Sequence, residues 1–183
     1  MRRIKDPADK KAGYRRESIE NATSSGVLGP RRINPNWLAA IQATVNPSPY
    51  FDLQSMEIKD LTPGASRIEI TLARKHLQPF GIVHGGVYST LVDAAGFWAC
   101  YAQLEPGLGL TTVELKLNYL APAKEGRLIG LGRCIKQGRS LGLAEARVED
   151  DDGRLLAHGT VTLMVLKDLA LAGQEDLPPK FLN

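Results

Sequence analysis

Residues 81–101 read GIVHGGVYSTLVDAAGFWACY, a glycine-containing turn that leads into an apolar helical segment. Asp93 lies inside this segment, and between Lys75 and Glu105 it is the only charged side chain when the histidines are neutral. Because the predicted helix, at about residues 86–103, has almost no polar face, this carboxylate has little contact with bulk water. Burying an unpaired carboxylate costs free energy. We therefore expect Asp93 to have either a structural partner or a chemical function.

The residues before this segment predict a short helix and a hairpin. Asn34 followed by proline is a typical helix start, and apolar residues at helical spacing predict a helix that ends near Asn46. From Tyr50 the side-chain pattern changes to a period of two, which predicts a strand. Thr62–Gly64 predicts the turn that leads to a second strand over residues 67–73.

Four further strands are predicted after the apolar helix, because runs of apolar and β-branched residues alternate with turn residues there. The layout is that of an antiparallel α+β fold, in which a sheet curls around one buried helix. A helix that is apolar on nearly all sides requires more cover than one sheet provides, so we expect at least a dimer. The four strands are placed at residues 110–120, 127–136, 141–149 and 154–167.

Composition divides the chain into three parts. Residues 1–33 are polar and basic and are expected to form a flexible extension, residues 34–168 one folded domain, and residues 169–183 a trailing tail. The first 32 residues contain nine Lys and Arg against four Asp and Glu. Because Tyr14 is the only aromatic residue among them, we interpret this part as a solvated tail rather than a nucleic-acid-binding arm.

The remaining composition argues against several other classes of protein. Cys100 and Cys134 lie in apolar surroundings without CxxC spacing and are interpreted as core residues in a cytoplasmic protein, not as a zinc site or a disulfide framework. The longest apolar stretch is interrupted by polar residues, so no membrane span is predicted. The acidic run Asp150–Asp152 does not form a complete calcium loop and is interpreted as an exposed turn. No metal or other cofactor is expected.

Three motifs stand at a fixed spacing: Gln78 lies six residues before His84, His84 is followed by two glycines, and Asp93 lies nine residues after the histidine. With these motifs the chain resembles the hotdog-fold thioesterases over about residues 50–167, and within them the PaaI-like branch that includes one group of 4-hydroxybenzoyl-CoA thioesterases. The resemblance implies a hotdog fold, with a curved antiparallel sheet around one long helix. It also implies hydrolysis of an acyl-CoA at a site shared between two subunits of a homodimer or homotetramer.

Physical chemistry gives two of these residues separate functions. Thioester hydrolysis develops an oxyanion, and the Gly85 N–H at a helix N-terminus is a preorganised donor that a carbonyl can approach closely. A carboxylate in apolar surroundings, Asp93, can act as general base or as nucleophile. Desolvation is expected to raise its pKa and make it a better base. The alternatives are that Gly85 and Gly86 are only hinge residues and that Asp93 is only a structurally bonded carboxylate.

The resemblance assigns supporting functions to further residues. Gln78 and His84 would orient the carbonyl and the glycine turn, although His84 could instead be purely structural. Thr112 occupies the position of a hydroxyl that positions water in some relatives, and as an alternative it is simply a good strand residue. Other relatives carry a hydroxyl one turn after the acid, where this chain has Phe97, which leaves Thr112 or Ser89 for that function.

Substrate binding is expected near the turns. Gly86 belongs to the helix start, whereas Lys124, Arg139 and Ser140 border turns and could pair with CoA phosphates or be solvated. Two other functions remain open at this stage. One is a non-catalytic acyl-CoA-binding module, and the other is a hotdog enoyl-CoA hydratase, whose sequence pattern matches less well.

Overall fold

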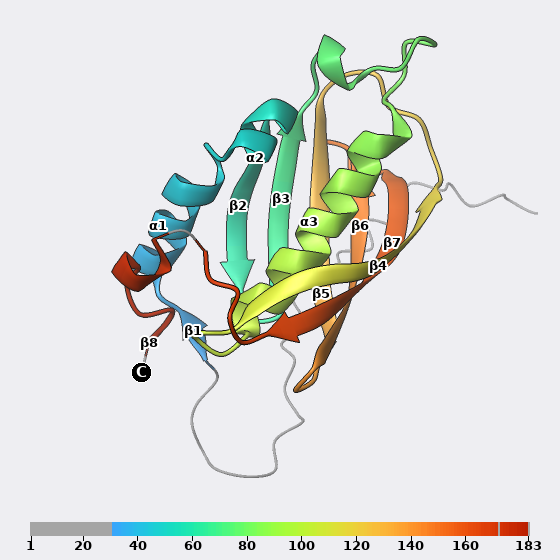
Figure 1. The fold of residues 1–183 in the computed structure, drawn as a ribbon. Helices are drawn as coiled ribbons and strands as arrows, with labels where there is room; N and C mark the ends of the chain where they lie inside the picture. The colour runs from blue at the N-terminus through green and yellow to red at the C-terminus, as the bar shows by residue number, and fades with distance from the viewer. Residues whose placement is uncertain (1–30, 172, 183) are drawn as a thin grey trace, which may run out of the picture.

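The computed structural model describes residues 31–171 and 173–182, in which one long helix is enclosed by a curved sheet (Figure 1). The long helix is α3 (Gly85–Gln103), and two shorter helices, α1 (Pro35–Val45) and α2 (Pro49–Gln54), precede it. The main sheet consists of β2 (Met56–Thr62), β3 (Ala65–Thr71), β4 (Gly109–Tyr119), β5 (Arg127–Gln137), β6 (Leu141–Glu149) and β7 (Leu155–Leu166). Short 3-10 turns occupy Arg74–His76 and Gln174–Asp176, and β1 (Arg32–Ile33) and β8 (Phe181–Leu182) form a separate pair.

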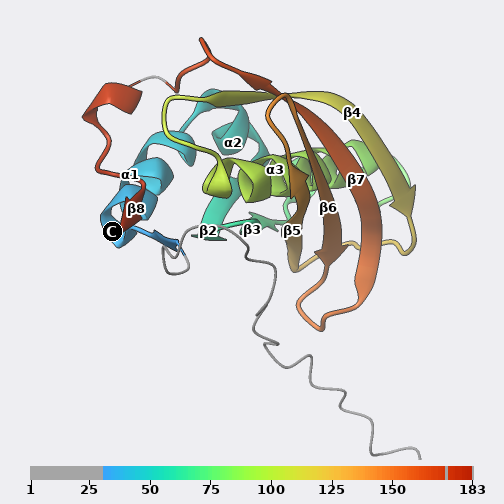
Figure 2. The same ribbon diagram turned by 90° about the horizontal axis from the view of Figure 1, so that it is seen from below.

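The six main strands follow the order β2-β3-β5-β6-β7-β4, and every neighbouring pair is antiparallel. α3 lies in the concave face of this sheet and contacts all six strands (Figure 2). Glycines permit this close approach: a Cβ on Gly132 would stand 2.0 Å from the carbonyl oxygen of Ala95, and one on Gly96 would stand 2.6 Å from Val161. The sheet therefore covers most of the helix surface directly, as the apolar sequence of α3 requires.

The segment that begins at Tyr50 is a helix at first and not a strand, so this prediction was wrong for residues 50–54. Ser48 and Pro49 start α2 as an N-cap and a proline at the first turn, the same signal that correctly placed the start of α1. Ser55 ends the helix with a left-handed backbone, at φ 49°. The strand β2 begins only at Met56.

The end of the chain does not trail away from the body as expected. β8 pairs with β1 in antiparallel register, and the Asn34 N–H donates a 2.9 Å hydrogen bond to the Lys180 carbonyl. The Lys180 side chain itself is buried. Residues 174–182 thus hold the start of α1 and the end of α3 together, while residues 1–30, the bulk of the predicted extension, lie outside the described part.

The other predicted elements are confirmed to within a few residues. The strands predicted after the helix correspond to β4, β5, β6 and β7, and α3 begins at Gly85. Cys100 is fully buried, and Cys134 is partly buried against the same core. No helix of the described residues is long and apolar enough to cross a membrane.

Candidate active site

One face of α3 is not covered by the sheet. Among the half-exposed residues of this helix, Gly85, Ser89, Asp93 and Phe97 recur every four positions, which places them on one stripe of the helix surface. Most of the other residues of α3 are buried in the protomer. Two of the residues to which the sequence assigned chemistry, Gly85 and Asp93, therefore lie on the same open stripe.

Asp93 has one hydrogen-bond partner within the described residues, the hydroxyl of Thr112, which donates to Oδ1 at 2.8 Å. Thr112 lies on β4 immediately before Val113, where the register with β7 shifts by one residue. Such a bulge commonly redirects neighbouring side chains. Burial raises the pKa of the Asp93 carboxyl above its ordinary value, and the Thr112 hydrogen bond offsets part of that rise.

A cavity of about 240 Å³ opens beside Asp93, between α2 and α3. Tyr50 and Phe51 of α2 form one wall, and the Tyr50 hydroxyl lies 2.8 Å from the hydroxyl of Thr90. Sequence reasoning did not find these residues, because it assigned them to a strand. The helix-start signal at Ser48 and Pro49 could have placed them correctly.

The N-terminus of α3 is capped by its own histidine. The His84 Nδ1 accepts a 2.9 Å hydrogen bond from the Gly86 N–H, so this ring nitrogen carries no proton. The Gly85 N–H makes no hydrogen bond within the described residues, and Gly85 is partly exposed. This geometry leaves the Gly85 N–H available to an external acceptor at the positive end of the helix dipole.

Gly85 borders a second cavity, of about 390 Å³, to which Gln78 and Tyr119 also contribute. The Tyr119 ring lies over the glycine, because a Cβ there would stand 3.1 Å from the ring. Tyr88 lines the same cavity, and its buried hydroxyl has no hydrogen-bond partner in the described residues. The sequence did not identify Tyr88, because nothing in it distinguishes this hydroxyl from those of Ser89 and Thr90 beside it.

The loop before α3 is fixed by a second histidine that sequence reasoning also missed. The buried His76 Nδ1 accepts from the Ala73 N–H at 2.9 Å, and its Nε2 lies 3.0 Å from the Gln54 carbonyl oxygen, to which it donates. Burial lowers the pKa of His76. The His84 backbone N–H in turn donates to the His76 backbone carbonyl, so His76 links α2 through its side chain to the start of α3 through its backbone.

Gly85 and Asp93 do not meet within one protomer. Eight residues of α helix separate them, a rise of about 12 Å, and they border different cavities. A thioester carbonyl held at one of them is therefore out of reach of the other in the same chain. The expectation of a site shared between subunits stays a prediction, and this spacing is compatible with it.

The predicted phosphate-binding residues lie at opposite ends of the sheet. Lys124 precedes β5 at the end where α3 begins, and the adjacent Ala123 carbonyl accepts a 2.9 Å hydrogen bond from the Val83 N–H. Arg139 and Ser140 follow β5 at its other end and are exposed. Arg154, which the sequence did not single out, borders the same cavity as Lys124.

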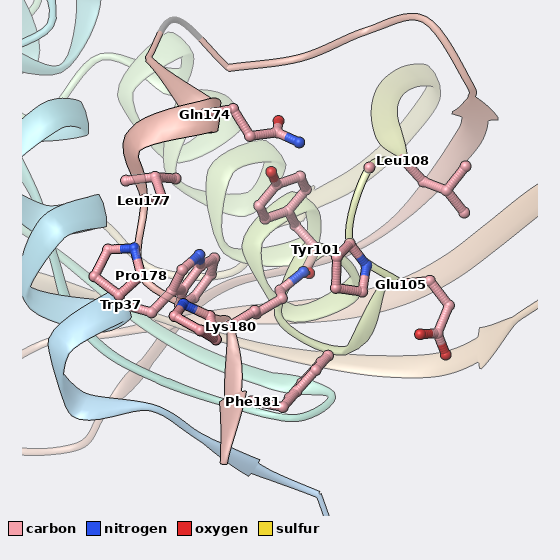
Figure 3. A pocket seen from close by; sticks show the side chains of 12 residues that line it. Trp37, Tyr101, Glu105, Leu108, Gln174, Leu177, Pro178, Lys180 and Phe181 are labelled. Atoms are coloured by element: carbon pink, nitrogen blue, oxygen red, sulfur yellow. The ribbon is translucent and has the colours of Figure 1, made fainter. Parts of the chain in front are cut away.

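A fourth cavity, of about 410 Å³, lies at the C-terminal end of α3 around Lys180 (Figure 3). The Lys180 Nζ donates to the carbonyl oxygens of Tyr101 and Leu104 and lies 4.3 Å from the Tyr101 ring centroid. This lysine therefore caps the C-terminal end of α3 and fixes the C-terminal segment against it. No cluster of three His, Cys, Asp or Glu side chains within residues 31–171 and 173–182 forms a metal site.

Known proteins resemble the chain over the same region. The sequence pattern of the thioesterase superfamily matches residues 80–157, from the loop before α3 into β7. A Saccharolobus solfataricus protein that is provisionally named an esterase is 32% identical to this chain over 118 residues. The match covers 64% of this chain and 78% of that protein. Acyl-coenzyme A thioesterase 13 of Mus musculus is 30% identical over 120 residues, which is 62% of this chain and 84% of the mouse enzyme.

A solved structure agrees with these sequence matches. The crystal structure of a thioesterase family protein from Silicibacter pomeroyi has a TM-score of 0.65 at 30% identity, and the match covers 71% of this chain and 98% of that one. The predicted curved sheet around one helix and the predicted class of thioester hydrolase are thereby confirmed. The chain belongs to the thioesterase superfamily.

Proposed function

We propose that the protein is an acyl-CoA thioesterase in which Asp93 is the catalytic carboxylate. The observation that carries the proposal is the setting of Asp93, a half-buried carboxylate with a raised pKa and one hydroxyl partner, on the stripe of α3 that the sheet leaves open. A carboxylate whose pKa moves toward neutrality is a better general base. The mouse relative is by name an acyl-CoA thioesterase, which supports the same substrate class.

The hydrolysis requires two steps that the site can support. In the first, Asp93 accepts a proton from water as the water oxygen bonds to the thioester carbon, and the Gly85 N–H of a second subunit hydrogen-bonds the oxyanion. In the second, the C–S bond breaks, and the CoA sulfur takes the proton from Asp93. As a nucleophile, Asp93 would instead bond to the acyl carbon while the C–S bond breaks and CoA leaves as a thiolate. Water would then attack the resulting anhydride, releasing the acid and the free Asp93 carboxylate, and a proton of the water would pass to the CoA thiolate. The Thr112 hydroxyl is close enough to Asp93 to position the water.

A second copy of the chain is part of this proposal. β4 is an edge strand of the main sheet and carries exposed apolar residues, Val113 at 51% and Tyr119 at 57% exposure. An edge with free backbone groups and apolar side chains is a template for pairing with another strand. Pairing there would cover the open stripe of α3 and bring Gly85 of one subunit toward Asp93 of the other. A homodimer is the smallest assembly that does this, and a homotetramer can contain it.

We assign supporting functions to further residues from their positions around Gly85. Gln78 and His84 shape the loop and the helix start, so we assign them positioning functions, with His84 acting through its bond to Gly86. Lys124 is an exposed cation at this end of the sheet and suits a CoA phosphate. Arg139 and Ser140 could reach the same CoA only from another subunit. We assign the activity to residues 34–168 of a cytoplasmic protein with reduced cysteines.

Thiol release from a panel of acyl-CoAs tests the proposal. The purified full-length chain should release CoA thiol from at least one short, long or aromatic acyl-CoA, and Asp93→Asn should lower kcat by roughly 100-fold or more. Loss of conjugated absorbance from an enoyl-CoA without thiol release would instead identify a hydratase. Tight binding of acyl-CoAs without turnover would identify a binding module.

A further inference from the structure

The two cysteines of the chain meet at the junction of α3 and β5. The Cys100 thiol on α3 donates to the Cys134 sulfur on β5, and the two sulfurs lie 3.0 Å apart. Cys100 is fully buried, whereas Cys134 is partly exposed. Neither cysteine contributes to the proposed hydrolysis, so their pairing requires a separate explanation.

The surroundings of Cys134 favour its thiolate. The Gln103 side-chain N–H donates to the Cys134 sulfur at 2.8 Å, in addition to the Cys100 thiol, and the backbone of Lys136 and the charge of Arg133 act in the same direction. These contacts lower the pKa of Cys134, with the Cys100 hydrogen bond as the largest cause. The same coupling and burial raise the pKa of Cys100. One sulfur is therefore placed as the nucleophile and the other as a resolving thiol.

We propose that this pair is an oxidation site, at which a hydroperoxide converts Cys100 and Cys134 into a reversible intramolecular disulfide. The Cys134 thiolate attacks the outer peroxide oxygen, the O–O bond breaks, and the products are a Cys134 sulfenic acid and an alcohol or water. The Cys100 sulfur then displaces hydroxide from this sulfenic acid, which leaves with the thiol proton as water. Overall, two thiols are oxidised by two electrons and one peroxide is reduced.

The geometry permits the second step without rearrangement of the fold. A disulfide requires the sulfurs to approach from 3.0 Å to about 2.05 Å, a movement of about 1 Å. Cys134 lies where β5 shifts register against β6, between Cys134 and Lys136, and such an irregularity leaves the intervening residue outside the regular ladder of hydrogen bonds. The bond would tie the C-terminal half of α3 to β5, two helical turns after Asp93.

Peroxide treatment of the reduced, folded, full-length chain tests the proposal. Hydrogen peroxide should remove both free thiols, lower the intact mass by about 2 Da, leave a single-chain band on a non-reducing gel, and be reversed by dithiothreitol. The oxidised chain should also melt at a higher temperature than the reduced chain, because the bond closes a loop of the unfolded chain.

Two matched variants separate the functions of the sulfurs. Cys100→Ser should still react at Cys134 and form a sulfenic acid that dimedone traps, whereas Cys134→Ser should keep its Cys100 thiol under the same treatment. In neither variant should peroxide treatment raise the melting temperature above that of the reduced form. Three results would each overturn the proposal: thiols that react only after unfolding, a disulfide between chains, or a Cys134→Ser variant that loses its thiol as fast as the natural chain.

Discussion

The Thr112 hydroxyl on β4 donates a 2.8 Å hydrogen bond to the Asp93 carboxylate on α3. This bond joins the edge strand of the sheet to the central helix and opposes the effect of burial on the carboxyl. It favours the charged form, whereas desolvation favours the neutral form and raises the pKa of Asp93. The balance between the two effects sets the pH above which the carboxylate can accept a proton.

Replacing Thr112 by valine should move the acidic limb of the pH–rate profile to higher pH. The substitution removes the hydrogen bond that stabilises the charged carboxylate, so the pKa of Asp93 should rise further and the base should form only at higher pH. The pH dependence of kcat/KM for thiol release measures this shift. Thr112→Ser retains the hydroxyl and should keep the limb near its original pH. An identical profile for all three proteins would show that Thr112 does not tune the base.

Asp93→Asn should raise the melting temperature at neutral pH while it removes activity. The pKa of Asp93 is higher in the folded than in the unfolded chain, so the unfolded chain releases this proton at lower pH. Stability is therefore lost as the pH rises from the unfolded value of 3.8 through the folded value, and the loss persists at pH 7. Asparagine carries no charge at any of these pH values, so the variant avoids this loss of stability. Thermal melts should show the largest gain near pH 7 and a smaller one near pH 3; equal gains at both values would contradict the assignment.

Gly85→Ala should lower kcat by roughly 10-fold or more, because it obstructs the donor N–H proposed for the oxyanion. A Cβ at this position would lie 3.1 Å from the Tyr119 ring, so the ring must also move by a few tenths of an ångström. Tyr119→Phe is the control, since it keeps the ring and removes only the hydroxyl that lies 3.0 Å from the Ser89 hydroxyl. Thiol-release kinetics compare the two variants. A similar loss in both would assign the effect to Tyr119 rather than to the N–H.

Local sequence signals were sufficient for most of the fold. α3 and the strands β4 to β7 could be predicted, because the apolar periodicity and the turn residues indicate the same element boundaries along this whole segment. Residues 50–54 were misread because a six-residue helix is too short for its period to be distinguished from alternation. The fold of the C-terminal segment depends on contacts such as that between Asn34 and Lys180, which are far apart in the sequence and leave no local pattern.

The candidate site was predictable only in part. Asp93 could be identified because a single charge in an apolar helix is costly, and Thr112 could be identified through a family resemblance. Tyr50 could have been placed on a helix by the start signal at Ser48 and Pro49, whereas Tyr88 reaches its cavity through tertiary contacts that leave no local pattern. The relation between Gly85 and Asp93 depends on how two chains associate, and the order of residues in one chain does not determine this.

Lys180→Met should remove a specific pH dependence of stability at the C-terminal end of α3. Burial lowers the pKa of Lys180 from 10.5 to about 7, so between these values the unfolded chain binds a proton that the folded chain does not. The free energy of unfolding of the natural chain should therefore rise with pH across this window, by up to about 1.4 kcal/mol per pH unit from this group, and the contribution should be absent in the variant. Urea unfolding of both proteins at several pH values between 7 and 10 measures the difference, in which all other titrating groups cancel. Methionine can still pack beside Trp37 and Tyr101, so a fold collapse is not expected to obscure the comparison. A difference that does not change with pH would show that the buried amine keeps its proton through its bonds to the Tyr101 and Leu104 carbonyls.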